Sequence, residues 1–187
     1  MGKERITAFE DAILAIIMTI LVLELNKPDQ VTWHGLWLLH DSFFAYAISF
    51  FWIGLMWVSH HNNWHHVKVI NMQTVYLTIV LLFFASLFPY TTSLVSDNFD
   101  NATAQVLYGL IVIIISLLNV ALFLNLGKIN PEATFKLLYT ASNRVVLIDL
   151  GIKVIGLILA LTIFPPAMLY SIFIASLTIG IGFARTN

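Results

Sequence analysis

The stretch RITAFEDAILAIIMTILVLEL, residues 5–25, opens with Arg5, Glu10 and Asp11 and continues as an apolar run over 12–23. A bilayer core of roughly 30 Å needs about 20 apolar residues in a helix. Charges at the mouth of such a helix are costly unless another group pairs with them. This stretch therefore predicts a membrane-spanning helix whose charged residues have a structural or functional role.

The composition of the whole chain agrees with a membrane protein. Hydrophobic residues make up 59 % and charged residues 10 % of the 187 residues, and the mean hydropathy is +0.89. A soluble domain carries about 25 % charged residues. The net charge of −1 indicates neither a nucleic-acid partner nor a polybasic membrane patch. Because the chain has no cysteine, disulfides and thiolate metal sites are excluded.

Six apolar segments predict an all-α, polytopic membrane protein with one six-helix domain over residues 1–187. We expect the helices near 6–25, 33–59, 72–93, 103–126, 143–163 and 166–184. Polar or breaker residues separate them at 26–30, 96–101, 127–131 and at Pro165-Pro166. The two halves show no internal repeat, so any central pathway is expected to come from the symmetry of an oligomer.

Lysine and arginine predict the orientation of these spans. Seven basic loop or terminal residues fall on the side of the termini and one on the other side: Lys3, Arg5, Lys68, Lys128, Lys136, Arg144 and Arg185 against Lys27. The positive-inside rule then places both termini in the cytoplasm. We expect the protein to lie in the cell membrane. A cleaved signal peptide is the weaker interpretation of residues 1–25, because Asp11 interrupts it and a small-residue cleavage site is missing.

Three short motifs carry a resemblance to a known family. The first helix holds Arg5-x-x-x-Phe9-Glu10-Asp11, the second Trp57-Val-Ser-His60-His61, and the third Ser86-Leu-Phe-Pro89-Tyr-Thr-Thr92. In this order and spacing they resemble the transmembrane protein 175 family, the lysosomal potassium channels and their bacterial homologues. The family pattern of the first motif is Arg-x-x-x-Phe-Ser-Asp, so Glu10 replaces a serine, and Thr78 stands where the family has asparagine. The resemblance covers the first half of the chain.

The resemblance implies a homotetrameric channel, not an enzyme, with no cofactor and no metal. Potassium and other monovalent cations would pass through a central pore lined by the first helix. Its constriction would be formed by Ile16, Ile20 and Leu23, with Thr19 beside them. A ring of large aliphatic side chains can gate by dewetting and select weakly between ions. A Thr-Val-Gly-Tyr-Gly filter does not occur in the sequence.

Six residues are expected to form a structural polar network beside the pore helix: Arg5, Phe9, Asp11, Trp57, His60 and His61. Asp11 lies about 140° around the helix from Ile16, so it faces the bundle if Ile16 faces a pore. The competing interpretation is a charged anchor that marks the membrane edge. For Glu10 we expect a place near the cytoplasmic mouth, where it concentrates cations or sits in water.

Histidines 60, 61, 65 and 66 form a second cluster. His61 and His65 are spaced to share a metal on one helix face, but no carboxylate or thiolate close in sequence completes a site. Interfacial histidines beside Trp57 and Trp64 are the simpler interpretation, with pH sensing as an additional role.

Asp149 and Lys153, four residues apart, predict a compensated pair inside the fifth span. They also leave an alternative function open, a proton- or cation-coupled transporter that uses Asp11, Asp149 and the histidines as relays. A membrane enzyme with a histidine-bound metal is the third alternative. Flux that saturates and requires a proton gradient would favour the transporter over the channel.

Overall fold

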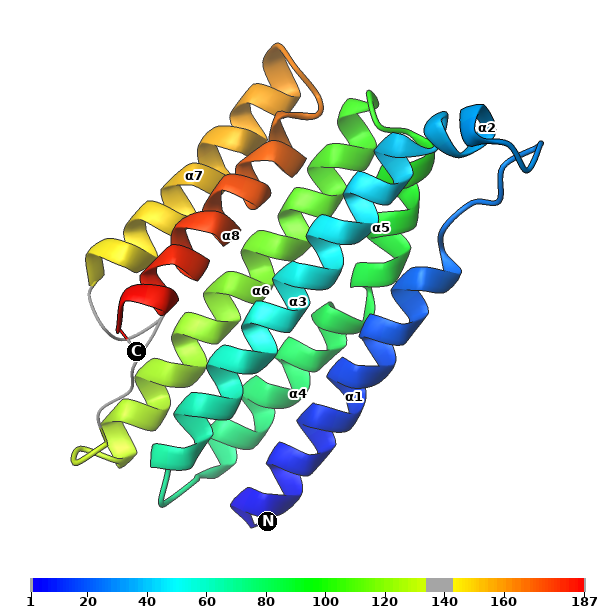
Figure 1. Ribbon diagram of the computed structural model, residues 1–187. Helices are drawn as coiled ribbons and strands as arrows, with labels where there is room; N and C mark the ends of the chain where they lie inside the picture. Colours follow the sequence, from blue (N-terminus) through cyan, green and yellow to red (C-terminus); the bar gives the residue numbers. More distant parts are fainter. Residues whose placement is uncertain (1, 134–142, 187) are drawn as a thin grey trace.

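The computed structural model describes residues 2–133 and 143–186, and Figure 1 shows a bundle of long, roughly parallel helices. The described residues contain no strand, which confirms the predicted all-α class. In chain order the helices are α1 (Lys3–Leu23), α2 (Trp33–Trp37), α3 (His40–His66), α4 (Met72–Ser86), α5 (Phe88–Asp97), α6 (Ala102–Ile129), α7 (Asn143–Thr162) and α8 (Ala167–Thr186).

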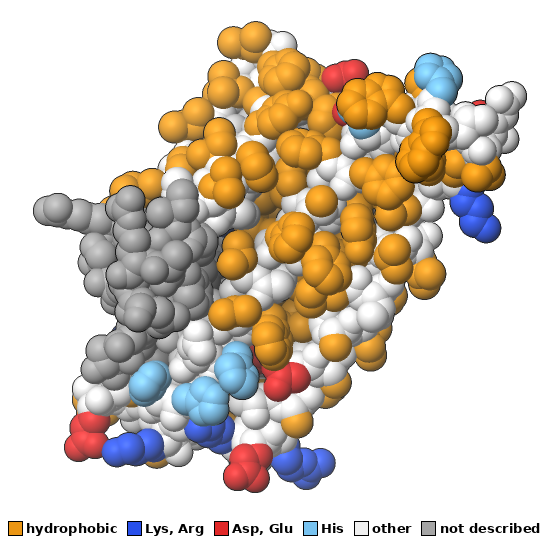
Figure 2. Space-filling model, viewed as in Figure 1, with side chains coloured by type: hydrophobic (Ala, Val, Ile, Leu, Met, Phe, Trp, Pro, Cys, Tyr) orange, Lys and Arg blue, Asp and Glu red, His pale blue; other side chains and the backbone are white. Residues whose placement is uncertain are grey.

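Within residues 2–133 and 143–186, four stretches are long and apolar enough to cross a membrane: Lys3–Leu23, His40–His66, Met72–Asp97 and Ala102–Ile129. The chain is therefore a polytopic membrane protein, as the composition predicted. Hydrophobic side chains cover the middle of the face in Figure 2, while charged and histidine side chains gather at the end where the N-terminus lies. Helices α7 and α8 pack against each other and alongside α6 (Figure 1).

The second predicted span, 33–59, is wrong at both ends. Residues 33–37 form the separate helix α2, because the chain turns at Leu38 and Leu39 before α3 begins. At the other end α3 continues to His66, so all four clustered histidines lie on the helix. Hydropathy could not separate α2 from α3, since α2 holds two tryptophans and a leucine and α3 continues with phenylalanine and other apolar residues.

The third span is one apolar stretch that is broken in its second half. Pro89 occupies the second position of α5 and has no N–H to donate to the carbonyl of Ala85. The chain therefore turns at Leu87 and resumes as α5, which continues to Asp97. The predicted end near residue 93 falls within α5, four residues before the helix ends.

One asparagine completes the turn between α3 and α4. The Asn130 Oδ1 atom accepts hydrogen bonds from the backbone N–H groups of Lys68 and Val69, both at 2.9 Å, and its Nδ2 donates to the Val69 carbonyl at 2.9 Å. Lys3 Nζ donates to the Val67 carbonyl at 2.8 Å. Because buried backbone groups require partners, these bonds tie α1, the turn and the end of α6 together.

Close backbone contacts bring α8 against α6 and α7. A Cβ atom placed on Gly109 of α6 would lie 2.6 Å from Met168 Sδ, and one on Gly156 of α7 would overlap the Ser171 side chain. Small residues at such positions let helices approach closely inside a membrane, where van der Waals packing drives their association.

We expect Gly156→Ala to destabilise the protein by about 1–3 kcal/mol, because the added methyl group cannot fit beside Ser171. The matched control is Gly151→Ala on the same helix, where the added methyl group meets no atom within 4 Å. That change should be neutral or gain up to about 1 kcal/mol through better helix propensity. Thermal unfolding in detergent compares the two variants. Equal stability of both would contradict the close α7–α8 contact.

Candidate functional site

Helix α1 is packed on one side only. Its buried residues recur every three or four positions and face α3, α4 and α5: Ile6, Glu10, Leu14, Ile17 and Leu21. In an apolar 18-residue stretch of α1 only 28 % of the residues are buried, against 44 to 50 % in the corresponding stretches of the other three candidate spans. The opposite side of α1 is therefore an open apolar face.

The predicted constriction residues share this open face. The side chains of Ile16, Ile20 and Leu23 are exposed to 56 %, 36 % and 78 %. Thr19 is also exposed, and its hydroxyl donates to the Ile16 carbonyl at 2.7 Å. Its oxygen lone pairs remain available to accept a hydrogen bond or to face an ion.

Asp11 binds the second long helix at the edge of the open face. Trp57 Nε1 donates to Asp11 Oδ1 at 2.8 Å, and the Trp57 ring stacks on His61 with 5.4 Å between centroids. The structure thus brings Asp11, Trp57 and His61 of the predicted network together. Arg5 and Phe9 lie at the surface instead, and Arg5 forms no side-chain hydrogen bond within the described residues.

Glu10 is placed differently from our expectation. It is 2 % exposed, so the prediction of a carboxylate in water or at the channel mouth is wrong. One carboxylate oxygen pairs with His60 Nδ1, and the other accepts from Trp64 Nε1 at 3.0 Å. Burial is possible because two donors on α3 satisfy the charge.

The other nitrogen of His60 completes a chain across three helices. His60 Nε2 faces Asn119 Oδ1 on α6, and Asn119 Nδ2 donates to Met56 Sδ at 3.3 Å. Both ring nitrogens of His60 therefore face acceptors, an arrangement that suits an imidazolium paired with the Glu10 carboxylate. Glu10 and His60 form a buried, internally neutral pair that joins α1, α3 and α6.

Sequence reasoning missed Asn119 and Trp64 as members of this network. A usable signal was present for Asn119, because α6 is apolar along most of its 28 residues. An isolated polar residue in such a span commonly faces the interior of the bundle. Its partner, however, belongs to a helix far away in the sequence.

The predicted pair on α7 is confirmed. Lys153 Nζ lies 2.6 Å from Asp149 Oδ2, and both residues are almost fully buried. The ammonium group also donates to Ser116 Oγ of α6 at 2.9 Å and lies 5.6 Å from the Trp52 ring centroid of α3. In the described residues the side-chain hydrogen bonds of this pair extend to Ser116 and do not reach Asp11.

The other three histidines of the cluster, His61, His65 and His66, lie on the surface of α3. His61 and His65 are in contact, with 3.3 Å between their Nε2 atoms. The described part of the chain holds no group of three or more histidine, aspartate or glutamate side chains that fits a metal ion. A two-histidine contact alone is short of the three or four protein ligands typical of a zinc centre.

Comparison with known proteins finds relatives that are named ion channels. Residues 5–89 match the family model described as endosomal/lysosomal potassium channel TMEM175. The chain is 36 % identical over 110 residues to a protein of Chryseobacterium sp. (strain P1-3) named a potassium channel, covering 59 % of this chain and 57 % of that one. It is 30 % identical over 132 residues to a potassium channel of Streptomyces collinus, covering 66 % and 64 %.

A more distant relative and a solved structure extend the comparison. The endosomal/lysosomal proton channel TMEM175 of Mus musculus is 34 % identical over 101 residues, which cover 48 % of this chain and 20 % of the mouse protein. A crystal structure described as a lysosomal potassium-selective channel TMEM175 homolog from Chamaesiphon minutus has the same fold. Its TM-score is 0.72 at 22 % identity, with 96 % of each chain covered. The matches to the two bacterial sequences span about three fifths of their lengths.

Proposed function

Because this chain is a homologue of the transmembrane protein 175 family, we propose that it is a potassium-permeable cation channel. The observation that carries the proposal is the open apolar face of α1, the least buried of the four candidate spans. Copies of the chain assembled around an axis would cover this face and surround a central pore with four α1 helices.

In this arrangement Ile16, Ile20 and Leu23 form the constriction, and Thr19 lies beside it. Apolar side chains around a narrow pore oppose the entry of water and so raise the barrier to ions. Potassium gives up its water more readily than sodium, which provides weak selection. The expected gate is thus a set of aliphatic rings rather than a filter of backbone carbonyls.

The polar contacts on the back of α1 would hold this pore helix in place. Glu10 lies about 120° and Asp11 about 140° around α1 from Ile16, in opposite directions. Glu10 binds His60 and Trp64, and Asp11 binds Trp57, so α1 is attached to α3 at two adjacent positions. These attachments set the tilt of the helix and with it the width of the constriction.

The proposal includes six spans in one domain over residues 1–187, with α7 and α8 as the fifth and sixth. The excess of basic residues at the end that holds the N-terminus supports a cytoplasmic location for both termini. The expected location is the cell membrane, and the expected partners are lipid and further copies of the chain.

Proton conduction is a second candidate, favoured by one specific observation. Glu10 and His60 form a buried pair of ionisable side chains, and such groups inside a membrane span are typical of proton pathways. Relatives from mouse and other vertebrates are named proton channels. A coupled transporter gains less support, because the hydrogen bonds of Asp149 and Lys153 end at Ser116.

Ion flux into liposomes tests the proposal. We expect purified protein in vesicles to pass potassium down its gradient at equal pH on both sides, faster than sodium and without saturation. Empty vesicles provide the baseline, and a pH-sensitive dye in the same vesicles reports proton entry. Potassium flux that saturates and disappears without a proton gradient would overturn the channel in favour of the transporter. Proton flux alone would favour the second candidate.

A further inference from the structure

The short helix α2 is amphipathic and carries the most exposed tryptophans of the chain. None of its five residues is buried, and Trp33 and Trp37 are exposed to 89 % and 71 %. The helix is nevertheless well formed, because the Thr32 side chain caps it by accepting from the Gly35 N–H at 3.0 Å. A defined helix that displays two large aromatic rings indicates a surface with a partner.

One side of α2 borders an apolar groove. The groove has a volume of about 500 Å³ and separates α2 from the first turns of α3. Its walls are almost entirely aromatic or aliphatic: Trp33, Leu36, Trp37, His40, Phe43 and Phe44. The only polar side chain is His40, whose ring stacks on Trp37 and whose Nδ1 contacts the Trp37 carbonyl at 2.9 Å.

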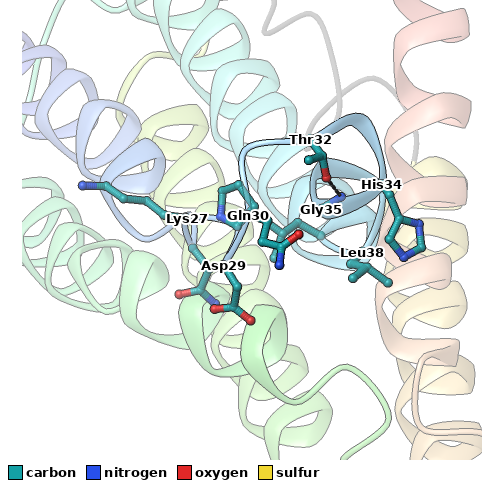
Figure 3. Close-up of a pocket in the computed structure, with 10 residues that line it drawn as sticks. Lys27, Asp29, Gln30, Thr32, His34, Gly35 and Leu38 are labelled. Carbon is teal, nitrogen blue, oxygen red and sulfur yellow. Dashed lines mark hydrogen bonds between the residues drawn. The ribbon is translucent and has the colours of Figure 1, made fainter.

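The other side of α2 borders a polar pocket of about 610 Å³, shown in Figure 3. Its lining comes mainly from the connection between α1 and α2 and includes Lys27, Asp29, Gln30 and His34. The boundary between apolar and polar surroundings thus runs along α2 itself. A helix with such faces is suited to lie in the plane of a membrane interface.

The groove opens toward the outer surface of α8. Phe44 packs against Tyr170 and Phe173 of α8, with ring centroids 5.4 Å and 6.0 Å apart. Both α8 rings remain partly exposed and continue the apolar surface of the bundle. In Figure 2 this surface extends over the spans to the end of the molecule where α2 lies. The groove is therefore continuous with the face that lipid contacts.

We infer that α2 lies in the membrane–water interface, with a phospholipid of the nearby leaflet in the groove. Trp33, Leu36 and Trp37 face the lipid, and the polar pocket faces water. Tryptophan favours this depth because its ring is apolar and its indole N–H can bind ester or headgroup oxygens. The groove fits the upper part of an acyl chain. Its described lining residues include no lysine or arginine, so the lipid we infer is zwitterionic.

Site-directed spin labelling can test the position of α2, because the chain has no native cysteine. A nitroxide at Leu36→Cys, on the apolar side of α2, leaves both tryptophans in place. Its collisions with oxygen and with a water-soluble nickel complex are measured in phosphatidylcholine vesicles. Asp100→Cys, in the α5–α6 connection, gives the aqueous reference, and Leu117→Cys, exposed on α6, gives the lipid reference.

The Leu36 label should give collision rates between those of the two reference sites. In the Trp33→Ser, Trp37→Ser background it should shift to the aqueous value. An aqueous value with both tryptophans present would overturn the inference. A second result would also overturn it. If the label collides rarely with both reagents, and its spectrum shows dipolar broadening that vanishes on dilution with unlabelled protein, a second copy of the chain covers α2.

Lipid occupancy of the groove has its own readout. Phosphatidylcholine brominated near the top of the acyl chain should quench wild-type tryptophan fluorescence more strongly than that of a Trp33→Phe, Trp37→Phe variant. The other three tryptophans serve as the internal background, and two of them, Trp52 and Trp64, are buried. Equal quenching of the two proteins would exclude lipid from the groove.

Discussion

Replacing Lys153 by methionine will destabilise the folded protein by about 3–5 kcal/mol, since it leaves the Asp149 carboxylate buried without its counter-charge. The change also removes the hydrogen bond to Ser116 and the contact with the Trp52 ring, so α7 loses its polar attachment to α6 and α3. Methionine has a similar length and is apolar, so the loss of side-chain volume is small. Unfolding in detergent, followed by circular dichroism, will show the lower stability.

Two further variants separate the charge effect from packing. Asp149→Asn leaves the lysine ammonium buried and should be destabilising to a similar degree. The double variant Asp149→Leu, Lys153→Met removes both charges and should recover most of the stability, because apolar replacements of a buried pair are often neutral. A Lys153→Met protein as stable as the wild type would contradict this account of the pair.

The second large effect concerns conduction. Ile16→Asn should raise the conductance several-fold and reduce the preference for potassium over sodium, because an amide in the constriction lowers the barrier to water and ions. Ile16→Ala should act in the same direction by widening the ring. Currents in planar bilayers measure conductance, and reversal potentials under mixed potassium and sodium measure the preference.

The control for this experiment follows from the structure rather than from the sequence. The position of Ile111 in an apolar span predicts that it faces lipid, but it is only 7 % exposed, and its replacement would disturb the core. Leu117, exposed to 50 % on the same helix, is the better control. Leu117→Asn should leave both quantities unchanged. Unaltered currents in a correctly assembled Ile16→Asn protein would remove α1 as the pore lining.

The sequence predicted the long helices well, because hydropathy summed over about 20 residues is a strong signal. The segments expected at 103–126 and 143–163 correspond to α6 (Ala102–Ile129) and α7 (Asn143–Thr162). The Asp149–Lys153 pair was also predictable, since both residues lie on one helix and their spacing alone brings them together. A pattern of neighbouring residues is therefore sufficient to predict contacts that form within one helix.

Features that depend on partners from other helices were not predictable. Glu10 is buried because His60 and Trp64 of α3 bind it, and nothing in its own helix distinguishes it from an exposed carboxylate. The burial of Ile111 was missed for a related reason. Helix α6 is apolar around its whole circumference, so periodicity does not identify the face that packs. Neither the exposed face nor the buried face could be assigned before the neighbours were known.

The bonds from Asn130 to Lys68 and Val69 have a consequence for the synthesis and membrane insertion of the protein. The α3–α4 turn is synthesised early, yet the side chain that binds its backbone groups, Asn130, lies about sixty residues later in the chain. Until that asparagine emerges, the turn must keep its N–H groups in water or with a chaperone. The helices before α6 can therefore enter the bilayer one by one, but the α3–α4 turn becomes fixed only after α6 has been made.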